Sequence, residues 1–244
     1  MTQWNFFRFG FCAAFVLSMA TVTARADDTR DQPSKPAPKG AMLLFDGKNL
    51  DGWENMSRRA APWPVEDGYM QVKPGTGDIR TKRKFGTDYD LHVEFWLPLM
   101  PDAHDQARAN SGVYLNGNYE VQVLDSYHND TYANGSVGAL YGLITPDKDA
   151  QAKAIRPPEQ WQTYDITFHA PKVNGQGAVV TKGRLTVVLN GVAIIKDGEF
   201  DKVTGGAMTD KVNAPGPLRL QDHGCKVRYR NIWLKPSEDL QRDK

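Results

Sequence analysis

The stretch SGVYLNGNYEVQVLD, residues 111–125, decides the fold class. It holds two runs of alternating apolar and polar residues, separated by Asn116-Gly117. Alternation with a period of two is typical of a strand that buries one face, and Asn-Gly is the preferred two-residue turn of an antiparallel hairpin. We therefore predict a β-hairpin. Its second strand would place Tyr119, Val121 and Val123 on one face and Glu120, Gln122 and Leu124 on the other.

The same pattern recurs on both sides of this hairpin. Short alternating runs occupy residues 41–46, 63–73, 89–98, 161–170, 183–195, 217–223 and 227–235. Asp67-Gly68 and Asn190-Gly191 supply two further hairpin turns. Residues 126–160 form the longest segment without a strand pattern, and no long amphipathic helix is apparent. These features predict an all-β fold, a two-sheet antiparallel β-sandwich or jelly roll.

The N-terminal 26 residues have the pattern of a signal peptide. Arg8 precedes an apolar run at residues 9–20, and Ala24-Arg25-Ala26 provides a cleavage site. The run is shorter than the roughly 20 residues that span a bilayer, which disfavours the alternative of an uncleaved anchor. We expect a secreted or periplasmic protein that starts at Asp27 and has no membrane span after signal removal.

The remainder of the chain divides simply. Residues 27–39, DDTRDQPSKPAPK, are polar and rich in proline and are predicted to be a linker. Residues 40–236 show no second low-complexity stretch and are predicted to form one domain, followed by a charged tail at residues 237–244.

The charge balance argues against a nucleic-acid partner. The whole chain carries 30 Lys and Arg against 29 Asp and Glu, and loss of Arg8 and Arg25 with the signal leaves 28 against 29. Such a balance provides no electrostatic footprint for nucleic acid. Cys12 is lost with the signal too, so the remaining Cys225 has no partner for an internal disulfide and is interpreted as a small apolar filler. The oligomeric state stays open.

Several strands carry long polar groups on the face that would not enter the core. The candidate site residues are Glu94 and Trp96, Asn110 and Tyr114, Glu120 and Gln122, and Arg219, Gln221 and His223. Flat rings to stack on, together with amides, carboxylates and a guanidinium, suit a sugar. If these strands are neighbours in one sheet, they form a sugar-binding face; the alternative is a set of solvated outer faces with cross-strand pairs.

Other motifs give weaker signals. The chain has no HExxH, paired CxxC, GxSxG or phosphate loop. The loop at residues 125–130 could offer metal ligands or be an ordinary polar loop, so a metal site is unknown and no cofactor is certain beyond a possible divalent cation. The basic run at residues 80–84, RTKRK, is interpreted as a solvated turn. Trp53, Trp63, Trp161 and Trp233 are interpreted as core residues.

Six blocks follow one another in a familiar order. They are LLFDGKNLDGW (43–53), WPVEDGYMQV (63–72), NSGVYLNGNYEVQVLDS (110–126), WQTYDITF (161–168), LNG (189–191) and GPLRLQDHGCKVRYRNIWLKP (216–236). Together they resemble the 3-keto-disaccharide hydrolase domain family over residues 41–236. The resemblance implies a concanavalin-like jelly roll with a concave sugar-binding face, and hydrolase or lyase action on glycosides oxidised at C3. It marks Asn110, Glu120, Gln122, Gln221 and His223 as site positions.

The chemistry of such a substrate needs one base. A ketone at C3 acidifies the proton at C2, so a base can remove it while the C1 substituent leaves. His223 is a candidate because its ordinary pKa is about 6.5, and Glu120 is another if burial raises its pKa. Arg219 or a divalent cation could stabilise the oxyanion. Two other functions are open: a carbohydrate-binding module without catalysis, and a conventional glycosidase with Glu94 and Glu120 as its two carboxylates.

Overall fold

The computed structural model describes Met1 and residues 34–237. The strands are β1 (Met42–Phe45), β2 (Trp53–Asn55), β3 (Val65–Glu66), β4 (Tyr69–Gln71), β5 (Ile79–Thr81), β6 (Asp88–Trp96), β7 (Asn110–Leu115), β8 (Tyr119–Leu124), β9 (Trp161–His169), β10 (Lys172–Val173), β11 (Val179–Thr181), β12 (Gly183–Leu189), β13 (Val192–Phe200), β14 (Arg219–Leu220) and β15 (Arg228–Pro236). The helical elements are η2 (Asp105–Ala107), η3 (Ala133–Gly135) and α1 (Lys148–Ala154). The predicted signal peptide, most of the linker and nearly all of the tail lie outside the described residues.

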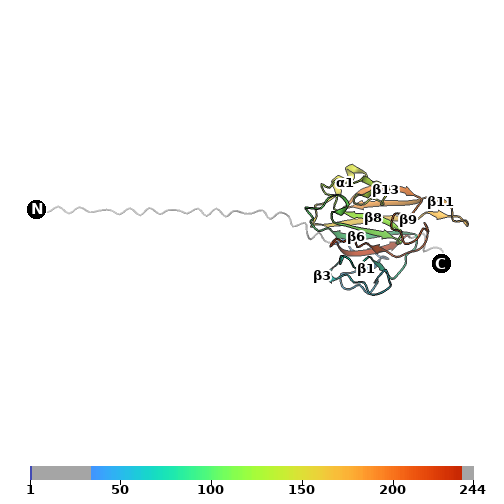
Figure 1. The fold of residues 1–244 in the computed structure, drawn as a ribbon, viewed down its shortest axis with the longest axis horizontal. Coiled ribbons are helices and arrows are strands. Elements are labelled where there is room, and N and C mark those ends of the chain that lie inside the picture. Colours follow the sequence, from blue (N-terminus) through green and yellow to red (C-terminus); the bar gives the residue numbers. More distant parts are fainter. Residues whose placement is uncertain (2–33, 238–244) are drawn as a thin grey trace.

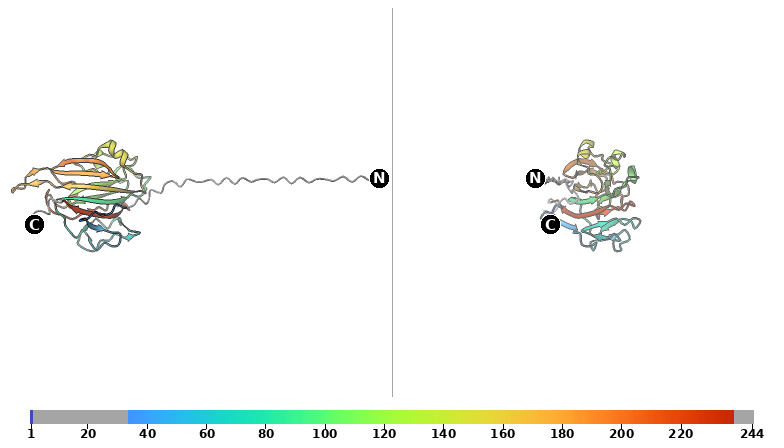
Figure 2. Two further views of the ribbon diagram at one scale, coloured as in Figure 1. Left: turned by 180° about the vertical axis from the view of Figure 1, so that it is seen from behind. Right: turned by 90° about the vertical axis from the view of Figure 1, so that its left-hand side faces the viewer.

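The strands form two antiparallel sheets packed as a sandwich. The large sheet has the order β13-β12-β9-β6-β15-β4-β3, with β1 also paired to β15. The small sheet has the order β2-β5-β14-β7-β8. Figure 1 shows α1 beside β13 at one edge of the large sheet and β1 and β3 near the opposite edge. Figure 2, from behind and from the side, shows β15 crossing the middle of that sheet in red. The predicted all-β two-sheet fold is confirmed.

The core lies between the two sheets, where the alternation predicted it. Val93 and Phe95 of β6 are fully buried on the inner face of the large sheet, and Val121 and Val123 of β8 are fully buried on the inner face of the small one. Of the four tryptophans assigned to the core, Trp53 and Trp63 lie in it. Trp161 and Trp233 are buried too, but on the outer face of the large sheet, opposite Trp96 and His92. Apolar area removed from water in this way is the main stabilising contribution in a chain without a disulfide.

The three predicted hairpin turns are present. In the β7–β8 turn, Asn116 has φ +52° and Gly117 has φ +70°. Positive φ at both central positions defines the turn type whose twist matches that of the paired strands. The β3–β4 and β12–β13 turns repeat this geometry at Asp67-Gly68 and Asn190-Gly191.

The two C-terminal strands belong to different layers. The runs at 217–223 and 227–235 are separated by only three residues, but β14 lies in the small sheet and β15 in the large one. The chain therefore crosses from one layer to the other between them. Among the described residues, no helix is long and apolar enough to cross a bilayer.

Candidate functional site

The predicted grouping of site residues on one sheet is wrong for two of them. Glu94 and Trp96 belong to β6 of the large sheet, whereas β7, β8 and β14 belong to the small sheet. Because the neighbours of Glu94 along β6 face the core, its side chain lies on the outer face of the large sheet. Glu120 lies on the outer face of the small sheet, so the apolar core separates the two carboxylates. They cannot act together across one sugar as in a two-carboxylate glycosidase.

The other predicted residues meet at one cavity. A cavity of about 280 Å³ lies over the outer face of the small sheet. It is lined by Gln106, Asn110, Tyr114, Glu120, Gln122, Tyr141, Gly205, Gly206, Gln221 and His223. Six of the nine predicted site residues are in this set, drawn from β7, β8 and the chain that follows β14.

Cross-strand register places the central carboxylate. Tyr114 of β7 stands opposite Glu120 of β8, and Gly112 stands opposite Gln122. A Cβ at Gly112 would come within 2.3 Å of the Glu120 Oε1 atom. The glycine in the NSG motif is therefore needed to admit the Glu120 side chain against the sheet.

Glu120 is buried, and few hydrogen-bond donors stabilise its ionised form. It is 4% exposed, and its Oε2 accepts a hydrogen bond of 2.8 Å from the Tyr114 hydroxyl. Burial raises the pKa of Glu120 to about 7, although the Tyr114 hydrogen bond and the charge of Arg219 act in the opposite direction, while Asp78 adds to the rise. A carboxyl group with such a pKa can exchange protons at neutral pH.

Two buried amide oxygens at this cavity have no partner. The Asn110 amide nitrogen donates to the Gln106 carbonyl at 2.8 Å, but Asn110 Oδ1 accepts nothing. The Gln221 amide nitrogen donates to the Tyr114 hydroxyl at 3.3 Å, and Gln221 Oε1 is likewise unpaired. Buried acceptors without donors are unusual and costly. Both residues line the cavity.

Arg219 lies beside Tyr114 on the neighbouring strand and supports its position. Its guanidinium lies 3.6 Å from the centre of the Tyr114 ring, and its Nη2 donates to the Gly206 carbonyl at 2.7 Å. Its Nε is 3.5 Å from Asp78 Oδ2. Arg219 is 7% exposed and does not line the cavity. Substrate binding by Arg219 stays a prediction, and its position against the Tyr114 ring suits orienting Tyr114.

His223 occupies a different position from Glu120. It lines the cavity but is exposed, on the turn that follows β14. Glu120 thus lies at the buried base of the cavity and His223 at its rim.

Loop residues that sequence reasoning missed complete the walls. Gln106 of η2 donates to the Thr131 hydroxyl at 2.7 Å and accepts from the Gln122 amide at 3.0 Å. Tyr141 and Gly206 enter from the segments after β8 and β13. Loops carry no periodic signal, so these residues could not be identified individually. Tyr141 lies in residues 126–160, the long segment without a strand pattern.

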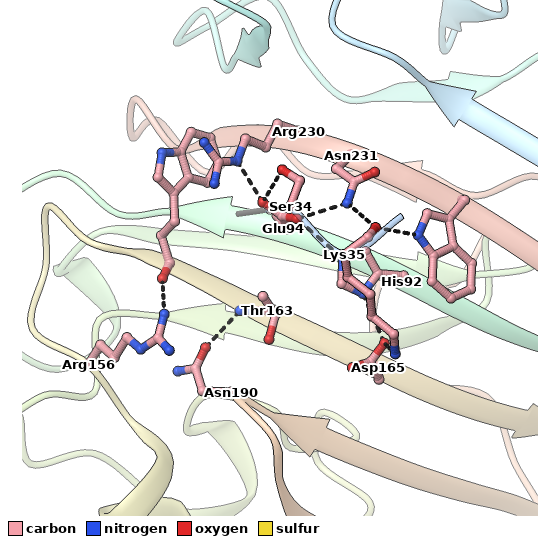
Figure 3. A network of polar contacts seen from close by, with 12 residues as sticks. Ser34, Lys35, His92, Glu94, Arg156, Thr163, Asp165, Asn190, Arg230 and Asn231 are labelled. Atoms are coloured by element: carbon pink, nitrogen blue, oxygen red, sulfur yellow. Dashed lines mark hydrogen bonds and ion pairs between the residues drawn. The ribbon is translucent and has the colours of Figure 1, made fainter. Parts of the chain in front are cut away.

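Glu94, by contrast, belongs to a saturated polar network (Figure 3). It accepts hydrogen bonds from Arg230 Nε at 2.6 Å, Asn231 Nδ2 at 2.8 Å and Ser34 Oγ at 3.1 Å. Burial opposes ionisation, but donation from His92, Asn231 and Arg230 outweighs it and lowers the pKa of Glu94 to about 2. Glu94 is therefore ionised at neutral pH, and its carboxylate oxygens are already occupied by hydrogen bonds from protein side chains.

The same network fixes the end of the predicted linker. Lys35 Nζ lies 2.8 Å from Asp165 Oδ1, and the Lys35 carbonyl accepts from Asn231 at 2.8 Å and Trp233 at 3.3 Å. Residues 34 and 35 therefore pack on the large sheet rather than hanging free (Figure 3). Trp96 is occupied too, because the Arg228 guanidinium lies 4.2 Å from its ring centre. Trp96 is half-buried and does not line the cavity that holds Glu120.

Residues 34–237 show no group of three or more His, Cys, Asp or Glu side chains arranged to hold a metal ion. In the loop at residues 125–130, Asp125 Oδ2 lies 2.7 Å from Arg108 Nε as an ion pair. The divalent cation considered from the sequence stays a prediction.

The fold is an antiparallel jelly-roll sandwich. A cavity on one outer face contains a buried carboxyl group and unpaired amide oxygens, which are groups suited to binding a polyhydroxylated ligand. The chain belongs to the family described as the 3-keto-alpha-glucoside-1,2-lyase-like domain, which matches residues 40–235. This confirms the family resemblance found in the sequence.

Solved structures agree. A Parabacteroides distasonis protein described as a proposed glycosyl hydrolase is 37% identical, with 85% of this chain and 94% of that one covered and a TM-score of 0.75. A second structure from that organism with the same description is 20% identical over 82% and 94%, with a TM-score of 0.58, and shows the fold alone. No curated protein matches the chain. These findings support a carbohydrate-active protein, either a glycoside-acting enzyme or a sugar binder.

Proposed function

We propose that this chain cleaves the C1 bond of 3-keto-glycosides by elimination, with Glu120 as the base. The observation that carries the proposal is the Glu120 carboxyl, buried in a polar cavity and with its pKa raised to about 7. Near neutral pH the group is present in both protonation states. It can therefore take a proton from the substrate and return it later in the cycle.

The reaction balances with one base. The Glu120 carboxylate removes the C2 proton, which the C3 ketone has acidified, and an enolate forms. The enolate collapses to a C1–C2 double bond as the C1–O bond breaks, and the electron pair leaves with the aglycone oxygen, which takes up a proton. Water added across the double bond gives net hydrolysis, and release before that step makes the protein a lyase.

The remaining groups have distinct roles in this proposal. Asn110 Oδ1 and Gln221 Oε1 accept hydrogen bonds from sugar hydroxyls, because both are buried and unpaired. Tyr114 holds the Glu120 carboxylate in place, and Arg219 orients Tyr114. His223, exposed at the rim, would protonate the departing oxygen in this proposal, and its exposed position supports that role over C2 proton abstraction. A divalent cation at the enolate oxygen remains an alternative source of stabilisation.

The second candidate is sugar recognition without cleavage. The two unpaired amide oxygens would serve a binding module equally well. The buried carboxyl favours the enzyme, because a raised pKa gives a binder no advantage over an ordinary carboxylate.

Deuterium labelling tests the proposal. The protein is incubated in D₂O with a glucosylglucose disaccharide and, in a separate sample, with its 3-keto derivative. Matching samples without protein correct for spontaneous exchange. We expect cleavage of the keto form alone, giving either the hydrated sugar with deuterium at C2 or, if release precedes hydration, the product with the C1–C2 double bond. Cleavage of the unoxidised disaccharide would overturn the proposal, and saturable binding without cleavage of either would leave a sugar binder. A parallel sample with chelator tests the cation.

A further inference from the structure

A second cavity lies on the outer face of the small sheet, outside the catalytic cavity. It has a volume of about 400 Å³, and its walls include Glu54, Arg58, Arg80, Lys82, Lys84 and Met208. Four of these six side chains are cationic and only one is anionic. The RTKRK run, interpreted from the sequence as a solvated turn, therefore forms one side of a concave surface.

The positive charge of this cavity is largely uncompensated. Arg80 Nε lies 3.0 Å from Glu54 Oε1, so these two charges neutralise each other. Within residues 34–237, Arg58, Lys82 and Lys84 form no ion pair with a carboxylate. Three like charges around one hollow raise the local concentration of anions and attract a negatively charged group.

One row of side chains connects this cavity with Glu120. Across the small sheet, Glu54 stands opposite Arg80, Arg80 opposite Arg219, Arg219 opposite Tyr114, and Tyr114 opposite Glu120. Neighbouring strands are about 4.8 Å apart, so Arg80 lies about 14 Å along the row from Glu120. The two cavities therefore lie on one continuous face of the sheet.

A single loop forms the wall between them. Gly205 and Gly206 line the catalytic cavity, and Met208 lines the basic one. A Cβ at Gly206 would come within 2.9 Å of the Tyr114 hydroxyl, so the loop lies directly against the row. A ligand that leaves the catalytic cavity past this loop meets the basic cavity next.

We propose that the basic cavity is a subsite for an anionic group on the part of the substrate released from C1. This rests on the proposed function and specifies its substrate class: 3-keto-glycosides whose leaving group carries a carboxylate, sulfate or phosphate ester. The catalytic cavity, at about 280 Å³, is below the usual range for drug-sized ligands and suits one sugar unit. The rest of the substrate must therefore extend along the sheet, toward the cationic side chains that line the basic cavity.

A matched pair of substrates tests the subsite. One is 3-keto-glucosyl-glucuronate and the other 3-keto-glucosyl-glucose, which differ only in a carboxylate in place of a hydroxymethyl group. We expect kcat/KM to be about 10- to 100-fold higher for the acidic disaccharide at low salt, and the ratio to fall toward one in 0.5 M NaCl, where screening is strong.

Variants locate the preference. Lys82→Ala/Lys84→Ala is expected to bring the ratio of the two kcat/KM values close to one, and Lys82→Glu/Lys84→Glu to invert it. Lys148→Ala/Lys172→Ala, which removes two exposed lysines distant from the small sheet, should keep the wild-type ratio. Equal kcat/KM values in the wild type, or a preference that survives in both Lys82/Lys84 variants, would overturn the subsite.

Failure of the proposed function can be told apart from failure of the subsite. If neither keto-disaccharide is cleaved, the elimination proposal fails, and the subsite is judged by calorimetric binding of the two unoxidised disaccharides. Tighter binding of the acidic disaccharide that is lost in Lys82→Ala/Lys84→Ala would support the subsite alone. Equal binding of both, or no binding of either, would overturn it.

Discussion

The two outer faces of the sandwich each bury one glutamate, and the two behave in opposite ways. Glu94 on the large sheet is 2% exposed and Glu120 on the small sheet is 4% exposed. Yet the pKa of Glu94 is lowered to about 2, and that of Glu120 is raised to about 7. Both side chains are nearly excluded from solvent, so their hydrogen-bond partners account for the opposite directions of the two pKa shifts.

Glu94 receives hydrogen bonds from a guanidinium, an amide and a hydroxyl and also faces His92. Glu120 receives one from a phenol. Burial alone favours the neutral carboxyl, and hydrogen bonds to the ionised form reverse that preference. A network whose polar groups are all satisfied holds a fold together, whereas buried groups left unsatisfied mark a site for a ligand.

The largest effect that would sharpen this contrast concerns activity. Glu120→Gln removes the base and is expected to lower kcat for a 3-keto-disaccharide by about 10²–10⁴-fold. Glu94→Gln, assayed well below its melting temperature, should retain kcat within a few-fold, since the core separates it from the cavity. Steady-state kinetics on both variants decides; comparable loss in both, with folding intact, would break the distinction.

The free energy of unfolding should respond in the reverse order, with a larger loss in Glu94→Gln than in Glu120→Gln. Glu94→Gln removes the ionised carboxylate whose pKa is lowered to about 2, and we expect a loss of about 3 kcal/mol in the free energy of unfolding at pH 7. Because the pKa of Glu94 is lower in the folded state, this contribution is present above about pH 4.5 and disappears as the pH falls toward 2. Urea unfolding across this range measures it, and a pH-independent loss would contradict the assignment.

Glu120→Gln should instead stabilise the protein at alkaline pH. The pKa of Glu120 is higher in the folded state, so the contribution of this group to wild-type stability is fully present below about pH 4.5 and is lost as the pH rises through 7. The variant cannot ionise there, and we expect it to gain up to about 3 kcal/mol over wild type at pH 8, and little at pH 4. Unfolding curves at the two pH values test this; a variant less stable than wild type at pH 8 would argue against a costly buried charge.

The pH dependence of cleavage reports the same group. Activity should rise with ionisation of Glu120, with a midpoint near pH 7. The Tyr114 hydrogen bond lowers the pKa of Glu120, so Tyr114→Phe is expected to move this midpoint to higher pH. Tyr127→Phe, outside the cavity, is the control. A midpoint unchanged in Tyr114→Phe would mean that another group limits the rate.

The smallest effect concerns the edge of the saturated network. Ser34→Ala removes one of the hydrogen bonds to Glu94 from an exposed position, and should cost about 0.5–1 kcal/mol in the free energy of unfolding. Ser57→Ala, also exposed, is the matched control. Equal effects in the two variants would show that residue 34 contributes nothing to holding Glu94.

The assignment of Glu94 and Trp96 to the sugar site failed for a definite reason. Alternation in residues 89–98 correctly placed them on an outer face, but a period of two says nothing about which sheet a strand joins. Strand order depends on long-range pairing, which no local pattern encodes. Glu120 and Gln122 were correctly predicted to share one face of the hairpin, because their partners Tyr114 and Gly112 lie within the same local element.

The sequence by itself determined the antiparallel hairpins, the inner and outer faces of the strands and the family, because alternation, turn residues and ordered motifs are local. Only the tertiary structure decided which outer face holds the cavity and that loop residues such as Gln106 and Tyr141 line it. It also decided that the pKa values of two buried glutamates shift in opposite directions. These properties arise from partners distant in the chain, as when Arg230 reaches Glu94 across β15 and β6. Desolvation and hydrogen bonding act between neighbours in space, and the fold alone makes them neighbours.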